Sequence, residues 1–140
     1  MRRSLSRHRV FLSHSSHDSW VATQIARHIR RCGTQTFLYE VDTEAGDDIE
    51  PRLAKALREC TELLVLLTPW SLERRYVWME IGAAWVQEKR ITAILYPMTF
   101  DELSRQANVP GLVKRTAVLN INEIDKYFEQ LRARIARKDR

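Results

Sequence analysis

Residues 62–85 read ELLVLLTPWSLERRYVWMEIGAAW, and this stretch decides the fold of the chain. The run of leucine and valine at 63–67 shows no alternation of polar and apolar residues, which is typical of a strand covered on both faces in a parallel sheet. A short turn follows at 68–71, and a helix begins beyond it. Because ligands of parallel sheets bind where the strands end at their carboxyl side, we expect a functional site at this turn and helix start.

The rest of the chain alternates between short apolar strands and amphipathic helices. The helix after the first strand carries Val21, Ile25 and Ile29 on one stripe, and Gly33 is a natural end for it. In the last helix apolar residues recur at i, i+4, i+7 and i+11 from Ile124, and Asn122 is its predicted N-cap. Strands are expected at 9–13, 36–39, 63–67, 91–96 and 117–121.

This alternation predicts the fold class. Strands that alternate with helices favour a parallel sheet with helices on both faces. The prediction is therefore an α/β, flavodoxin-like three-layer sandwich whose five-stranded parallel sheet has the order 2-1-3-4-5. In that order the switch point lies between the first and third strands, so His14–Ser16, the loop 40–48 and residues 68–80 should surround one cleft.

Length and composition describe one globular domain. The chain has 140 residues, 44% of them hydrophobic and 29% charged. No apolar run approaches the length of a membrane span, and the polar N-terminus does not resemble a signal peptide. Cys32 and Cys60 show no CxxC spacing, so we expect a reduced, cytoplasmic chain without a metal site or disulfide.

The net charge of +5 comes from arginine-rich ends, which we interpret as basic tails at 1–8 and 137–140 around a folded domain at 9–136. No zinc finger or other nucleic-acid signature accompanies these tails, so we do not expect nucleic acid as a partner.

This sequence lacks the residues that several functions of such folds require. The four glycines are scattered, so neither a P-loop nor a GxGxxG fingerprint is present. The acidic pair, aspartate and lysine of a phospho-acceptor domain are also missing at the ends of the predicted strands. No GxSxG nucleophile elbow supports a serine hydrolase.

What remains is one carboxylate, Glu80, on an apolar helix. A structural role would pair it with Arg74, Arg75 or Arg90. A chemical role is also available, because one carboxylate suffices to cleave a glycosidic bond whose leaving group departs neutral. Its negative charge stabilises the developing oxocarbenium ion, and the nicotinamide of NAD⁺ is such a leaving group.

Three segments of the chain resemble the Toll/interleukin-1 receptor (TIR) domains. VFLSHSSHD at 10–18 is similar to the first-strand box of that family, and FLYEVDTEAGDDIEPRLAKAL at 37–57 is similar to its second strand, BB loop and following helix. The quoted stretch 62–85 resembles the third-strand box and the helix in which an aromatic residue stands four positions before a glutamate. The three boxes occur in order and at the right spacing over nearly the whole chain.

The resemblance implies an activity and a set of site residues. One branch of the family cleaves NAD⁺ to nicotinamide and ADP-ribose or a cyclic isomer, and its catalytic glutamate matches Glu80. NAD⁺ is then the substrate, and no other cofactor is implied. Signalling in innate immunity, such as anti-phage defence, and homo-oligomers formed through the 40–48 loop belong to the same expectation. The substrate-binding residues it implies are His14, Ser15, Ser16, Tyr39, Glu44, Gly46, Trp70 and Tyr76.

Two other interpretations remain open at this point. Another branch of the family has no enzymatic activity and signals through TIR–TIR assembly. A nucleoside deoxyribosyltransferase-like enzyme would share the sheet and a glutamate, and would cleave 2′-deoxynucleosides. For His14 and the serines beside it, capping and turn formation are the alternative to ligand contact.

Overall fold

A single parallel sheet forms the centre of the molecule. The structure, a computed structural model, describes residues 7–38, 50–106 and 117–138. The strand order is β2-β1-β3-β4-β5, and all four pairings are parallel. This arrangement confirms the predicted α/β, flavodoxin-like fold and its strand order. The strands are β1 (Arg9–Ser13), β2 (Gln35–Leu38), β3 (Glu62–Leu67), β4 (Arg90–Leu95) and β5 (Ala117–Asn120).

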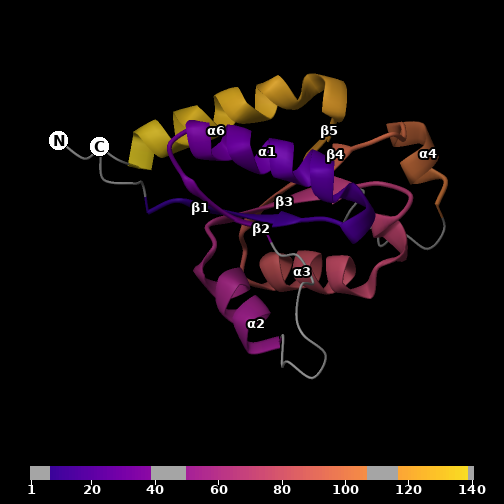
Figure 1. Cartoon of the computed structure of the whole chain (residues 1–140), viewed down its shortest axis with the longest axis horizontal. Helices are drawn as coiled ribbons and strands as arrows, with labels where there is room; N and C mark the ends of the chain where they lie inside the picture. The colour runs from indigo at the N-terminus through magenta and orange to yellow at the C-terminus, as the bar shows by residue number, and fades with distance from the viewer. Residues whose placement is uncertain (1–6, 39–49, 107–116, 139–140) are drawn as a thin grey trace.

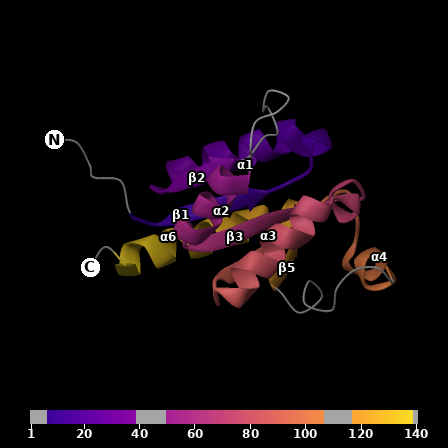
Figure 2. The same ribbon diagram turned by 90° about the horizontal axis from the view of Figure 1, so that it is seen from below.

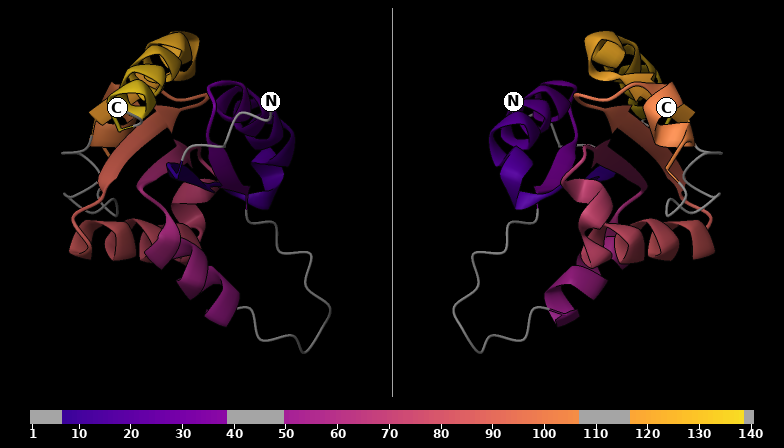
Figure 3. Two further views of the ribbon diagram at one scale, coloured as in Figure 1. Left: turned by 90° about the vertical axis from the view of Figure 1, so that its left-hand side faces the viewer. Right: turned by 90° about the vertical axis from the view of Figure 1, so that its right-hand side faces the viewer.

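Helices cover both faces of this sheet. Helices α1 (Ser19–Arg31) and α6 (Ile124–Lys138) lie on one face, and α2 (Glu50–Glu59) and α3 (Arg75–Val86) lie on the other (Figure 1). The end-on views of Figure 3 show the three layers most directly. Helix α4 (Phe100–Ser104) follows β4. Three short 3₁₀ turns complete the described elements: η1 (Ser16–Asp18), η2 (Ser71–Glu73) and η3 (Ile121–Glu123).

The central strand β3 supplies both halves of the core. Its side chains alternate between the two faces, as the pleat of a strand requires. Leu64 and Leu66 pack with α1 and α6, whereas Leu63, Val65 and Leu67 pack with α2 and α3. The six residues of β3 are all buried, which explains why its sequence shows no polar alternation. Figure 2, from below, shows α2 and α3 lying across their face of the sheet.

Two predictions concern residues at helix ends, and the structure confirms one of them. Gly33 ends α1 with a φ of +98°, a conformation that glycine adopts at little cost, as predicted. The prediction that Asn122 caps the last helix is wrong. Asn120 accepts a hydrogen bond from the Asn122 backbone N–H and begins η3, so α6 starts only at Ile124. None of the helices in the described ranges has the length and apolar character needed to cross a bilayer.

Candidate functional site

Glu80 belongs to α3 and lies at the carboxyl end of the sheet, where this helix faces the end of β1. It is the sixth residue of α3 rather than part of the first turn, because the turn η2 intervenes before the helix starts at Arg75. Its side chain is 4% exposed. The Ser13 hydroxyl, from the last residue of β1, donates a hydrogen bond to Glu80 Oε2. Ser13 pairs with Val65 of β3, so the contact joins the predicted switch-point strands to α3.

This environment disfavours the charged form of Glu80. Burial raises its pKa from 4.5 to about 7, and the hydrogen bond from Ser13 offsets only part of that effect. Among the described residues no arginine pairs with Glu80. Arg74, one of the partners considered above, donates instead to the Ser16 hydroxyl at 3.2 Å. A buried glutamate with a single neutral partner is costly for the fold, which makes it a candidate for function.

The turn before α3 is tied to the segment after β1. The Thr68 hydroxyl donates to Asp18 Oδ2 at 2.6 Å, and both residues are buried. The Ser71 backbone N–H donates to Thr68 Oγ1, and the Thr68 N–H donates to Ser71 Oγ. These bonds fix the position from which α3 starts, and therefore the position of Glu80.

Of the three predicted site residues that follow β1, one has a structural role and two are at least partly exposed. Ser15 is buried and caps η1, where its hydroxyl accepts from the His17 backbone N–H. This is the capping role considered as the alternative for this residue. Ser16 is exposed and His14 is partly exposed, so both are open to a ligand at the end of β1.

Two aromatic side chains lie on the surface near this end of the sheet. Trp70 is 43% exposed and Tyr76 is 51% exposed. The ring of Trp70 lies 5.9 Å from that of His17, between centroids. Exposed aromatic rings beside polar groups are suited to stacking against a base or a nicotinamide. The other predicted site residues, Tyr39, Glu44 and Gly46, lie outside the described residues.

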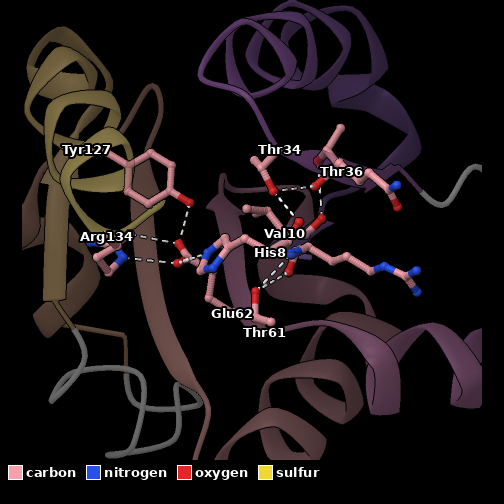
Figure 4. A network of polar contacts seen from close by, with 10 residues as sticks. His8, Val10, Thr34, Thr36, Thr61, Glu62, Tyr127 and Arg134 are labelled. Atoms are coloured by element: carbon pink, nitrogen blue, oxygen red, sulfur yellow. Dashed lines mark hydrogen bonds and ion pairs between the residues drawn. The ribbon is translucent and has the colours of Figure 1, made fainter. Parts of the chain in front are cut away.

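A second buried glutamate, Glu62, lies at the opposite end of the sheet, at the start of β3 (Figure 4). It accepts hydrogen bonds from the Tyr127 hydroxyl at 2.6 Å and from Arg134 Nη2 at 2.8 Å and Nε at 3.1 Å. His8 Nε2 donates to it at 2.7 Å. Burial raises the pKa of Glu62, but the bonds from His8, Arg134 and Tyr127 outweigh burial and lower it to about 2. Glu62 is therefore an ionised structural group.

Sequence reasoning missed the partners of both glutamates. The sequence pattern places Ser13 at the end of the first strand and gives it no link to Glu80. The signal for Ser13 was its place at the end of the first strand, beside the strand that leads to Glu80. Nothing local connects Glu62 with Tyr127 and Arg134, because they belong to a helix more than sixty positions away.

No metal cluster lies at Glu80 among the described residues. Within the described ranges, no three histidine, cysteine, aspartate or glutamate side chains gather as metal ligands. A pocket of about 320 Å³ lies between β2 and α2, and a groove of about 450 Å³ lies between β4 and α6. Glu80 lines neither of them. With Glu80 only 4% exposed, the described residues leave little of its side chain accessible.

Comparison with known proteins gives matches over most of the chain. A family model described as TIR domain matches residues 10–135. A curated relative from Brachypodium distachyon, "Probable 2' cyclic ADP-D-ribose synthase BdTIR", is 28% identical over 100 residues. That match covers 70% of this chain and 45% of the relative, so it spans less than half of the plant protein.

Solved structures show the same fold at low sequence identity. The TIR domain of the Toll-related receptor TRR-2 from Hydra magnipapillata has a TM-score of 0.64 and 18% identity, with 88% of this chain and 97% of that chain covered. The CMP N-glycosidase BcmB from Clostridium botulinum has a TM-score of 0.54 and 20% identity, with 88% and 97% covered.

Proposed function

Since the chain belongs to the TIR domain family, we propose that it is an NAD⁺ glycohydrolase or cyclase in which Glu80 is the catalytic residue. The reaction breaks the bond between nicotinamide and ribose and releases nicotinamide together with ADP-ribose or a cyclic ADP-ribose isomer. The observation that carries the proposal is the buried Glu80 carboxylate at the carboxyl end of the sheet, with Ser13 as its one hydrogen-bond partner among the described residues.

The chemistry needs negative charge and no general acid. Nicotinamide leaves as a neutral molecule, so the positive charge that remains develops on the ribose. An ionised Glu80 stabilises that charge and accepts hydrogen bonds from the ribose hydroxyls. Water then attacks the sugar carbon to give ADP-ribose, or the adenine attacks it to give a cyclic product.

The raised pKa of Glu80 is compatible with this role. With a pKa of about 7, a large fraction of the carboxyl groups is protonated at neutral pH. The nicotinamide ring of NAD⁺ carries a positive charge, and an opposite charge nearby lowers the pKa of a carboxyl group. Binding of the substrate thus favours the ionised form that the reaction requires. The activity named for the plant relative supports NAD⁺ as the substrate class.

The remaining site residues have supporting roles in the proposal. Trp70 or Tyr76 stacks on a ring of the substrate, and His14 and Ser16 contact it at the end of β1. The residues Tyr39, Glu44 and Gly46 complete the site, and copies of the chain assemble through the 40–48 loop. The protein acts in the cytoplasm in immune signalling, and NAD⁺ is a substrate rather than a cofactor.

The test compares nicotinamide release from NAD⁺ by the purified protein and by two variants. Glu80→Gln keeps the shape of the side chain and removes its charge, so release should fall at least about a hundredfold, as expected when an electrostatic contribution to the transition state is lost. Glu73→Gln makes the same chemical change at an exposed glutamate of η2 and should leave release unchanged. Equal rates in the wild type and Glu80→Gln would refute the catalytic role.

The same experiment distinguishes NAD⁺ cleavage from two other functions. CMP and 2′-deoxynucleosides serve as alternative substrates, because the fold also matches a CMP N-glycosidase. Cleavage of these compounds but not of NAD⁺ would identify a nucleotide or nucleoside glycosidase. If the folded protein cleaves none of them and Glu80→Gln still assembles, the chain is a TIR interaction module without turnover.

A further inference from the structure

A positively charged groove lies at the end of the sheet opposite Glu80. It is formed where β4 begins and where the last turns of α6 pass over the sheet, and its volume is about 450 Å³. Three arginines and no carboxylate are among its lining residues in the described part of the chain. Those residues are Arg90, Gln130, Ala133, Arg134 and Arg137.

Arg134 is held in a fixed orientation at this groove. Its Nε and Nη2 atoms bind the two carboxylate oxygens of Glu62, and its guanidinium lies 5.7 Å from the centre of the Tyr127 ring. Figure 4 shows both side chains reaching from α6 toward Glu62. The side chain of Arg134 is only 10% exposed. Its Nη1 atom takes no part in the pairing with Glu62, so a preorganised guanidinium keeps donors for another acceptor.

Arg90 and Arg137 add charge that no carboxylate of the described residues neutralises. Both are exposed, and the ion pairs of the described ranges do not include them. Arg137 stands in the last turn of α6, where the helix dipole by itself favours a cation. Arg90 begins a strand, so the dipole of α6 does not explain why a cation stands at this position. Its neighbour Lys89, by contrast, donates to the Arg58 carbonyl at 2.8 Å.

We propose that this groove, which we call the arginine groove, binds a small molecule through a phosphate or diphosphate group. Guanidinium groups match the geometry of phosphate oxygens with pairs of hydrogen bonds, and a diphosphate offers enough oxygens for three of them. Arg134 supplies the fixed contact, and the exposed Arg90 and Arg137 close on the ligand from the two sides. The side chains of Gln130 and Ala133 contact the part of the ligand that carries the phosphate group. This site is separate from Glu80 and does not depend on the proposed NAD⁺ cleavage.

The test uses two variants with the same change in net charge. Arg90→Gln/Arg137→Gln removes both exposed arginines of the arginine groove. Arg27→Gln/Arg30→Gln removes two exposed arginines from α1 and is the matched control. Pyrophosphate is titrated into each protein, and binding is measured by calorimetry and by the ¹⁵N–¹H signal of Arg134 Nε. Vesicles that contain a phosphorylated inositol lipid form a second arm, which distinguishes a lipid headgroup from a free phosphate ligand.

The expected result is pyrophosphate binding that shifts the Arg134 signal and weakens about tenfold or more in the groove variant, since charge-assisted contacts are lost. The control variant should bind as the wild type does. Binding to the vesicles alone, lost in the groove variant, would assign the same phosphate chemistry to a lipid headgroup. Equal losses in both variants would show diffuse attraction to a basic protein and overturn the proposal, as would the absence of binding in both arms.

Discussion

Two buried glutamates of this chain have opposite electrostatic environments. Glu62 is surrounded by His8, Tyr127 and Arg134, and its pKa falls to about 2. Within the described ranges, the hydroxyl of Ser13 is the one hydrogen-bond partner of Glu80, and burial raises the pKa of Glu80 to about 7. A carboxylate that the fold stabilises as an anion holds the structure together, whereas one that the fold destabilises needs another reason to be present. This contrast supports the proposal that Glu80 is the functional carboxylate of the pair.

The raised pKa of Glu80 predicts how stability depends on pH. Between pH 4.5 and 7 the folded state retains a proton that the unfolded state has lost, so the contribution of Glu80 to stability is present at low pH and is lost as pH rises through 7. Glu80→Gln removes this penalty. At pH 8 the variant should be more stable than the wild type by about 1–3 kcal/mol, and near pH 4 the difference should disappear.

Urea denaturation followed by circular dichroism at the two pH values measures this difference. Glu73→Gln is the control, because Glu73 is exposed and its replacement should not change the pH dependence. A Glu80→Gln variant that is less stable than the wild type at pH 8 would contradict the account. It would mean that the charge of Glu80 supports the fold.

Among the elements, the turn between β3 and α3 determines where Glu80 lies. Its sequence, Thr68 to Ser71, predicts a turn, and the structure places one there. That Thr68 reaches back to Asp18 could not be predicted, because the contact depends on how β1 and β3 lie side by side in the folded sheet. Local patterns therefore predicted the element, while the bond that anchors it follows from the tertiary arrangement.

Thr68→Val tests the importance of this anchor. The variant keeps the shape of the side chain but leaves the buried Asp18 without its hydroxyl donor and the buried Ser71 N–H without its acceptor, which should lower the free energy of unfolding by about 1–3 kcal/mol. Thr92→Val is the matched control, because Thr92 is also buried and its hydroxyl makes no hydrogen bond among the described residues. The control should change stability by less than about 0.5 kcal/mol. Equal effects of the two substitutions, measured by thermal and urea unfolding, would show that the bond to Asp18 is unimportant.

At the scale of the whole molecule, the fold could be predicted and the site only in part. Alternating strands and helices leave few ways to arrange a parallel sheet, so the order 2-1-3-4-5 followed from the pattern. The site could not be completed in the same way, because its contacts join distant parts of the chain: Ser13 lies 67 positions from Glu80, and Asp18 lies 50 positions from Thr68. The structure shows that the Glu80 side chain is buried, which the sequence did not indicate.

The burial of Glu80 is the basis of a prediction about assembly. If contacts between copies open the site, nicotinamide release per molecule should rise with protein concentration, in parallel with the average mass measured by light scattering. Glu80→Gln should assemble like the wild type, because a buried side chain does not lie on the surface where copies meet. A constant rate per molecule across a range in which the mass increases would show that assembly does not activate the protein.

The position of β1 in the sheet has a consequence for how the chain folds as it is synthesised. Of the described strands of this sheet, β1 is the first to leave the ribosome, yet it lies inside the sheet and pairs with β2 on one side and β3 on the other. Val10 cannot pair with Glu62 until β3 emerges, and until then one hydrogen-bonding edge of a strand with an apolar centre, Val10 to Leu12, stays open. Such an edge is a template for pairing with other chains. We infer that the nascent chain depends on chaperones most during the interval between the synthesis of β2 and that of β3.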